Sequence, residues 1–243
     1  MEIHHRHFTS IDSTNTWAKH NIHLFATDQI TLVTADEQTA GRGRFNRKWI
    51  SPADQNLYAT FCFFIEKHRT DIGNIPQILA ISAAKALEEL GFHPRLKWPN
   101  DVLLVGKKVA GILCETTPLS DHLGMILGIG INVNMPRALL EQIDRPATSL
   151  MVEGNKEHEV NDISQRLQSH FTANLALFFD EGFFPFLKDY RDRIQHQQDE
   201  IIRFHDNRIV WEGAFHAINT DGSLALKMKN GDIKTFVAGE ILF

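Results

Sequence analysis

The pattern of hydrophobic residues changes near residue 196, and this change limits the fold of the chain more than any other feature. After it come four short alternating runs, at residues 201–204, 209–218, 223–229 and 234–237. Asp221-Gly222 and Asn230-Gly231 separate these runs, and both dipeptides favour the tight turns of β-hairpins. We therefore predict a small all-β barrel over residues 196–243, which is too short to fold alone and should pack on a larger domain.

Residues 1–195 combine strand and helix patterns in one predicted domain. Alternating or apolar runs predict strands at residues 2–8, 29–35, 57–65, 95–97, 102–105, 108–116 and 122–131. Helical spacing predicts helices at residues 75–90, 162–179 and 181–194, and another that ends at residue 21 and is capped by Asp12 or Ser13. The predicted fold class is α/β, with a mixed β-sheet domain followed by the barrel.

The composition is that of an ordinary globular protein: 243 residues, 43% hydrophobic and 23% charged, with a net charge of -5. The acidic balance argues against a general nucleic-acid binder, which usually carries a basic surplus. Cys62 and Cys114 both lie in apolar strand-like runs, as expected of reduced thiols in the cytoplasm. Glycines interrupt the longest apolar stretch, residues 125–133, so no membrane span is expected.

The segment GRGRFNRKW (residues 41–49) places four cationic side chains in nine residues, with no acid among them. Its glycines let the backbone approach a ligand, and arginine guanidinium groups suit phosphate or carboxylate. Trp49 adds a flat face for a ring system. The segment indicates an anion-binding loop, and the alternative is a solvated basic loop. It is not a dinucleotide fingerprint, because Asn46 stands where the third glycine belongs.

The segment KWPND (residues 97–101) places Asn100 and Asp101 where a new strand begins. A carboxylate there could ligate Mg²⁺ or accept a proton. The alternative is an Asx-type turn that caps the strand, and these residues alone leave both interpretations open.

Lys108 begins KVAGIL (residues 108–113), an apolar strand. Strand alternation puts it on one face with Ala110 and Ile112, where a partly buried ammonium group would need an anionic partner. The alternative is an edge-strand lysine that prevents aggregation.

The segment GIGINVN (residues 128–134) is an apolar strand with two glycines, followed by paired amides. Glycine inside a buried strand marks the close approach of a ligand or of another backbone. A packing or bulge glycine is the alternative.

In this order and spacing, Ser13-Thr14-Asn15, Gln38 and the four motifs above resemble the biotin protein ligases. The resemblance covers essentially the whole chain and is most specific in GRGRFNRKW and KWPND. It implies a mixed-sheet catalytic domain of the biotin/lipoate ligase type, with a small C-terminal SH3-like β-barrel. It also implies an ATP-dependent enzyme that converts biotin to biotinyl-5′-AMP and transfers biotin to a lysine of the biotin carboxyl carrier protein of acetyl-CoA carboxylase.

The resemblance further assigns roles to particular residues. Arg44, Lys108 and Asp101 would be catalytic, and Asp101 would contact the Mg²⁺ that accompanies ATP. The biotin-binding residues would be Ser13, Thr14, Asn15, Gln38, Gly41, Arg42, Gly43, Arg44, Lys108, Gly111, Leu113 and Gly128. The ATP-binding residues would be Arg44, Arg47, Trp49, Lys97, Asn100, Asp101, Lys108 and Asn132.

Two departures from the family pattern bear on these expectations. Phe45-Asn46 stands where some members carry Arg-Gly, which removes one candidate phosphate contact. Only 12 residues precede Ser13, so neither a DNA-binding domain nor DNA binding is expected. A lipoate or octanoate transferase and a noncatalytic binding module are the alternative functions. The sequence leaves open whether the protein is a monomer or a homodimer.

Overall fold

The computed structural model describes residues 2–206 and 208–242, and of Asn46 the backbone alone. The chain divides into two compact units, the first comprising Met1–Arg69 and Lys107–Ser169 and the second Thr70–Gly106 and His170–Phe243. The second unit thus joins the C-terminal strands to earlier parts of the chain. The predicted domain boundary between residues 195 and 196 stays a prediction.

The first unit contains five strands in the order β1-β2-β3-β7-β6. They are β1 (Ile3–Ile11), β2 (Ile30–Gln38), β3 (Leu57–Glu66), β7 (His122–Ile131) and β6 (Lys107–Pro118). β1 runs parallel to β2 and the other pairs are antiparallel, so the sheet is mixed as predicted. β3 is buried along almost its whole length, as its continuous apolar run indicates.

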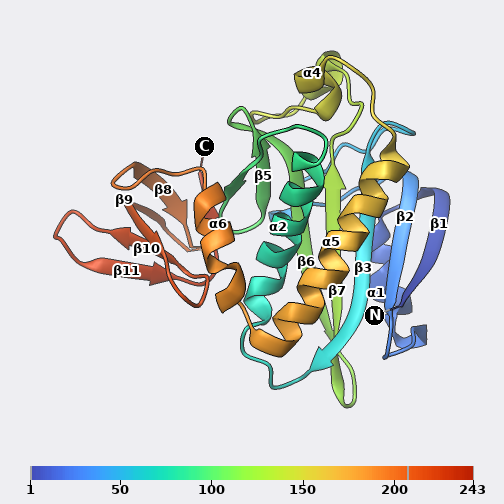
Figure 1. Ribbon diagram of the computed structural model, residues 1–243, viewed down its shortest axis with the longest axis horizontal. Coiled ribbons are helices and arrows are strands. Elements are labelled where there is room, and N and C mark those ends of the chain that lie inside the picture. Colours follow the sequence, from blue (N-terminus) through green and yellow to red (C-terminus); the bar gives the residue numbers. More distant parts are fainter. Residues whose placement is uncertain (1, 207, 243) are drawn as a thin grey trace. The chain divides into compact units, whose positions relative to one another are not determined.

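Helix α1 (Thr14–Asn21) lies against β2, β3 and β7 (Figure 1). Ser13, one of the two predicted caps, accepts a hydrogen bond from the backbone N–H of Thr16. Ala18 and Ile22, which directly follows the helix, are buried against side chains from all three strands, namely Val33, Cys62 and Ile126. This packing holds the C-terminal half of α1 against the sheet.

The second unit contains α2 (Ile75–Glu88), the short strands β4 (Arg95–Lys97) and β5 (Asp101–Leu104), and α6 (Leu187–Arg193). α2 is buried along most of its length and packs against both strands and α6.

Helix α5 (Val160–Glu181) begins in the first unit and ends in the second. The helix predicted over residues 181–194 begins only at Leu187, so the first part of that prediction is wrong. Gly182 takes a left-handed φ of 71° and ends α5, and Pro185 lies in a separate 3₁₀ turn.

The C-terminal strands form a five-stranded antiparallel sheet in the order β11-β10-β9-β8-β12 (Figure 1). They are β8 (Ile201–His205), β9 (Val210–Ile218), β10 (Leu224–Lys227), β11 (Ile233–Phe236) and β12 (Glu240–Ile241). Four match the predicted runs, and β12 is missed because two residues are too few to show alternation. Gly222 and Gly231 both take positive φ, as the predicted Asp-Gly and Asn-Gly turns require.

Polar side chains of the second unit hold the turn between β9 and β10. The carbonyl oxygen of Gly222 accepts hydrogen bonds from Trp98 Nε1 and Gln77 Nε2, both at 2.9 Å. The rings of Trp98 and Phe204 also meet, with their centroids 5.7 Å apart. The barrel therefore packs on α2 and the β4–β5 connection, as its small size predicts.

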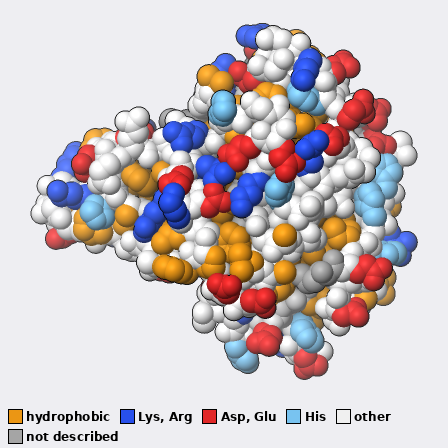
Figure 2. Space-filling view, viewed as in Figure 1, with side chains coloured by type: hydrophobic (Ala, Val, Ile, Leu, Met, Phe, Trp, Pro, Cys, Tyr) orange, Lys and Arg blue, Asp and Glu red, His pale blue; other side chains and the backbone are white. Residues whose placement is uncertain are grey.

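The surface drawn in Figure 2 carries basic and acidic side chains that are interspersed rather than separated. This mixture agrees with the small net charge of -5. Within the part of the chain that the structure describes, no helix is long and apolar enough to cross a membrane.

Candidate active site

A buried network of amide and hydroxyl groups lies where α1 meets the sheet. Gln38 Oε1 accepts hydrogen bonds from the backbone N–H and the hydroxyl of Thr14, at 2.9 and 3.1 Å. Asn15 Nδ2 donates to the carbonyl oxygen of Leu113 at 3.2 Å, and Thr60 Oγ1 lies 2.7 Å from Asn15 Oδ1. The structure thus brings together five of the predicted biotin-binding residues: Ser13, Thr14, Asn15, Gln38 and Leu113.

Three glycines form a floor beside this network. Gly111 on β6 lies opposite Gly130 on β7, and Gly128 lies two residues away on the same face of β7. A Cβ atom on Gly128 would lie 2.1 Å from Asn15 Oδ1, and one on Gly130 would lie 2.4 Å from the indole of Trp49. Any larger residue here would displace Asn15 or Trp49. These glycines therefore make room for side chains of other segments.

The predicted anion loop, residues 41–49, folds back on itself against this floor. The N–H of Gly43 donates to the carbonyl oxygen of Arg47 at 2.7 Å, and the N–H of Trp49 donates to that of Gly41 at 2.9 Å. A Cβ on Gly41 would lie 2.5 Å from the carbonyl oxygen of Trp49, so this close approach requires glycine. The fold directs the Trp49 indole onto the floor, where its Nε1 is buried with no hydrogen-bond partner among the described residues.

Phe45 is an exposed ring at the tip of this loop. Its backbone takes a left-handed φ of 57°. The guanidinium carbons of Arg44 and Arg47 lie 5.0 and 5.5 Å from its ring centroid, within the range of cation–π attraction. Phe45, which stands where some family members carry arginine, therefore contacts two guanidinium groups and does not supply one of its own.

Lys108 reaches the glycine floor from the start of β6. Its backbone N–H and carbonyl bond to residues 146–148, at 3.0 and 2.9 Å. A Cβ on Gly111 would lie 2.7 Å from Lys108 Nζ, which is 5.5 Å from the ring centroid of Trp49. The ammonium group of Lys108 thus lies beside Gly111, and not on the face of Ala110 and Ile112 as predicted, because the long side chain bends over the glycine.

Glu115, on β6, is a site residue that the sequence analysis misses. Its Oε1 accepts from Lys19 Nζ at 3.1 Å, and its Oε2 accepts from Arg42 Nη2 at 2.8 Å and from Asn15 Nδ2 at 3.1 Å. Burial raises the pKa of this carboxyl, but hydrogen bonds from Asn15 and Lys19 and the charge of Arg42 outweigh burial and hold the pKa below its usual value. Strand alternation, which places residues 111 and 115 on one face, is the signal that could have found it.

Asn132, a predicted ATP-binding residue, is buried at the end of the β7 segment. Its Nδ2 donates to the carbonyl oxygen of Thr148 at 3.0 Å, and the N–H of Thr148 donates to Lys108. Asn132 and Lys108 are therefore held by the same loop. Two short helices flank that loop, α3 (Arg137–Leu140) and α4 (Leu150–Gly154), and both are too short for their pattern to be predicted.

The KWPND segment belongs to the second unit. The β4–β5 register puts Lys97 directly opposite Asp101, and the two residues are only 3% and 8% exposed. Asn100 precedes Asp101 in the connection and is partly exposed. The predicted site residues therefore fall into two groups, Lys97, Asn100 and Asp101 here and all the others in the first unit.

The predicted Mg²⁺ contact has no metal cluster around it. Among the described residues, no three His, Cys, Asp or Glu side chains are grouped so that they could hold a metal ion. A lone carboxylate opposite a lysine suits one contact to an ion carried by ATP phosphates, rather than a resident metal site. The assignment of Asp101 to that contact stays a prediction.

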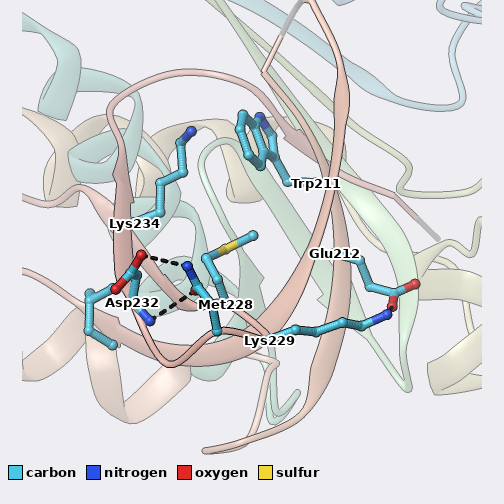
Figure 3. A pocket seen from close by; sticks show the side chains of 8 residues that line it. Trp211, Glu212, Met228, Lys229, Asp232 and Lys234 are labelled. Atoms are coloured by element: carbon cyan, nitrogen blue, oxygen red, sulfur yellow. Dashed lines mark hydrogen bonds and ion pairs between the residues drawn. The ribbon is translucent and has the colours of Figure 1, made fainter.

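A cleft of about 620 Å³ lies in the barrel, beside β9 and the turn that joins β10 to β11 (Figure 3). Lys234 Nζ lies 3.2 Å from the ring centroid of Trp211, and Lys229 pairs with Glu212 at 2.9 Å. Both lysines of the cleft are therefore engaged by its own side chains. The predicted site residues lie elsewhere in the chain.

Comparisons with known proteins show the family of this chain. Residues 7–132 match the model of the biotin/lipoate A/B protein ligase family. The chain is 32% identical over 235 residues to the bifunctional ligase/repressor BirA of Salmonella typhimurium, over 95% of this chain and 71% of that protein. It is 30% identical over 218 residues to the biotin–[acetyl-CoA-carboxylase] ligase of Paracoccus denitrificans, over 87% of this chain and 89% of that protein.

A solved structure extends the match to the fold. The biotin protein ligase from Aquifex aeolicus in complex with biotin and ATP superposes with a TM-score of 0.83 at 30% identity, over 98% of this chain and 97% of that one. Fold and sequence together define a protein ligase. The chain belongs to the biotin/lipoate A/B protein ligase family, which confirms the resemblance and the fold class predicted from its motifs.

Proposed function

We propose that this ligase attaches biotin to protein in two steps. The biotin carboxylate first attacks the α-phosphorus of ATP, pyrophosphate leaves, and biotinyl-5′-AMP forms. The ε-amine of a lysine on the biotin carboxyl carrier protein of acetyl-CoA carboxylase then attacks the acyl carbon, AMP leaves, and the amine loses a proton. Relatives named for biotin that match along nearly the whole chain support this chemistry.

The observation that carries the proposal is the meeting of Lys108, Trp49 and the Asn15 network on one glycine floor. The ureido ring of biotin has two N–H donors and one carbonyl acceptor. The amide and hydroxyl groups of Asn15, Thr14 and Gln38 are suitable partners for these, and the bare floor suits an apolar ring system.

The first step brings together two anions, the biotin carboxylate and the phosphates of ATP, which repel each other. The cationic side chains of the site would reduce this repulsion. Lys108 over the floor and Arg44 at the loop tip would offset the repulsion between carboxylate and phosphate, and would stabilise charge that develops in the transition state. Asp101 would contact the Mg²⁺ that enters with ATP. The other proposed nucleotide contacts are Arg47, Trp49, Lys97, Asn100 and Asn132.

The proposal is tested with the purified chain, biotin and MgATP. We expect pyrophosphate release, biotinyl-5′-AMP in the mass spectrum, and a biotin mass increase on an added biotin carboxyl carrier protein. Activation of lipoate without activation of biotin would instead make the protein a lipoate ligase. If neither biotin nor lipoate supports pyrophosphate release, the protein is a noncatalytic module.

A further inference from the structure

Glu115 collects hydrogen-bond donors from two separate segments of the first unit. Asn15 and Lys19 come from α1, and Arg42 comes from the loop of residues 41–49. Arg42 is fixed a second time, because its Nε donates to Thr16 Oγ1 at 3.0 Å. One carboxylate thus joins the start of the cationic loop to the helix whose first turn lines the proposed biotin pocket.

The carboxylate also determines which way the Asn15 amide points. An ionised carboxylate only accepts hydrogen bonds, so the Asn15 atom that faces Glu115 must be the donor, Nδ2. The same Nδ2 reaches the carbonyl oxygen of Leu113, and Oδ1 is thereby turned toward the hydroxyl of Thr60. The orientation of the amide follows from these partners.

These contacts differ from an ordinary surface ion pair. The Glu115 side chain is 16% exposed, whereas the side chains of Lys19 and Arg42 are 46% and 37% exposed. Exposed pairs contribute little, but charge-assisted bonds to a largely buried carboxylate are stronger. Arg42 also bonds to Thr16, and Asn15 also bonds to the carbonyl oxygen of Leu113. We therefore expect loss of their contacts with Glu115 to disturb the loop and the pocket more than loss of the contact with Lys19.

We propose that Glu115 is a positioning residue for the biotin site, which holds the Arg42 end of the loop against α1 and sets the Asn15 amide for ligand recognition. This inference rests on the proposed function. Glu115 acts through Asn15 and Arg42, and has no role at the reacting atoms. Its loss should therefore change the affinity for biotin and the order of the loop more than it changes kcat.

The test compares Glu115→Ala and Glu115→Gln with Lys19→Ala, which removes a partner of the same carboxylate outside the loop. Trypsin cleavage after Arg42, Arg44, Arg47 and Lys48, followed without ligand by mass spectrometry, reports on loop opening. Calorimetry with biotin and the separation of KM from kcat report on the pocket.

In Glu115→Ala we expect loop cleavage and the Kd for biotin each to rise about tenfold or more, since a lost charged hydrogen bond costs at least a factor of ten. The KM for biotin should rise with them, and kcat should stay within about threefold of wild type. In Glu115→Gln, loop cleavage and the Kd for biotin should lie between those of wild type and Glu115→Ala. This variant keeps an acceptor for Asn15 but loses the charge that holds Arg42. Lys19→Ala should stay within about twofold of wild type in every measurement.

Loop cleavage and biotin affinity within twofold of wild type in both Glu115 variants would overturn the inference. Glu115→Gln keeps the shape of the side chain, so it gives an answer even if Glu115→Ala fails to fold. Wild-type protein that does not bind biotin would refute the proposed function instead. In that event the cleavage measurement, which needs no ligand, still decides whether Glu115 holds the loop.

Discussion

The indole N–H of Trp98 donates to the carbonyl oxygen of Gly222 at 2.9 Å, and so joins the β4–β5 connection to a turn of the barrel. This connection leads directly to Asp101, the first residue of β5, which is placed at the nucleotide in the proposed function. A barrel turn therefore supports the backbone from which a proposed catalytic residue extends.

Replacing Trp98 by Phe keeps an aromatic ring but removes this donor. The free energy of unfolding should fall by about 1 kcal/mol, the usual value of one such bond, and the KM for ATP should rise more than the KM for biotin. Urea unfolding and steady-state kinetics measure the two effects. Trp211→Phe is the matched control, because it removes an indole N–H that bonds to Asp206 elsewhere in the barrel. An unchanged KM for ATP in Trp98→Phe would contradict the proposed coupling.

Lys108→Ala and Arg44→Ala should each lower the rate of adenylate formation by orders of magnitude while the fold stays intact, since each removes a cation that offsets two anions. Single-turnover pyrophosphate release measures the rate, and circular dichroism checks the fold. Lys107→Ala, which removes an exposed neighbouring charge, should retain the wild-type rate. Near-normal adenylation in the two main variants would remove both residues from the mechanism.

Gly128→Ala should weaken biotin binding, because the new Cβ would lie 2.1 Å from Asn15 Oδ1. Overpacking of this kind costs about 1–3 kcal/mol, so the Kd should rise about tenfold or more by calorimetry. Gly73→Ala is the control, since a Cβ there meets nothing within 4 Å. Equal affinity in the two variants would show that the glycine floor is not part of the pocket.

Two substitutions of Phe45 separate the effect of its ring on ATP binding from the effect of its left-handed backbone on stability. Phe45→Ala and Phe45→Gly both remove the ring that contacts Arg44 and Arg47, so both should raise the KM for ATP severalfold. Only glycine also relieves the left-handed φ, and its free energy of unfolding should be about 1 kcal/mol higher than that of the alanine variant. A wild-type KM in both variants would mean that the ring does not position the arginines.

Glu115 should make stability depend on pH in a defined direction. Its pKa is lowered in the folded state by hydrogen bonds from Asn15 and Lys19 and by the charge of Arg42, which together outweigh burial. Its contribution is therefore fully present above the unfolded glutamate pKa of about 4.3 and is lost as the pH falls through the lower folded value. The difference in unfolding free energy between wild type and Glu115→Gln should shrink across that window. A difference that stays constant down to acid pH would contradict this account.

Long or strongly punctuated elements of the fold could be predicted from the sequence. β3 is a continuous apolar run, α2 keeps helical spacing up to the glycine that follows it, and Gly222 and Gly231 mark hairpin turns. α3, α4 and β12 are too short to show a period. The helix after α5 begins late because a left-handed Gly182 interrupts the pattern.

The residues of the candidate site also include some that the sequence could indicate and some that it could not. Residues within motifs, such as Lys108 and Trp49, could be identified because the local sequence is distinctive. Thr60 could not, because its partners Thr14 and Asn15 lie far away in the sequence and meet it only through the packing of α1. Strand alternation places Glu115 on the face of Gly111, but its partners Asn15 and Arg42 become known only from the fold. The backbone of Lys108 likewise bonds to a distant segment, residues 146–148, that its own motif does not reveal.

The Trp49 indole already fills the space above Gly130, so a ligand cannot settle there until the ring swings aside. The indole N–H finds no acceptor among the described residues, so this movement breaks no hydrogen bond of that group. The movement of Trp49 would then limit the binding of biotin. At high biotin concentration, the observed association rate would reach a plateau equal to the rate at which the Trp49 ring leaves the floor.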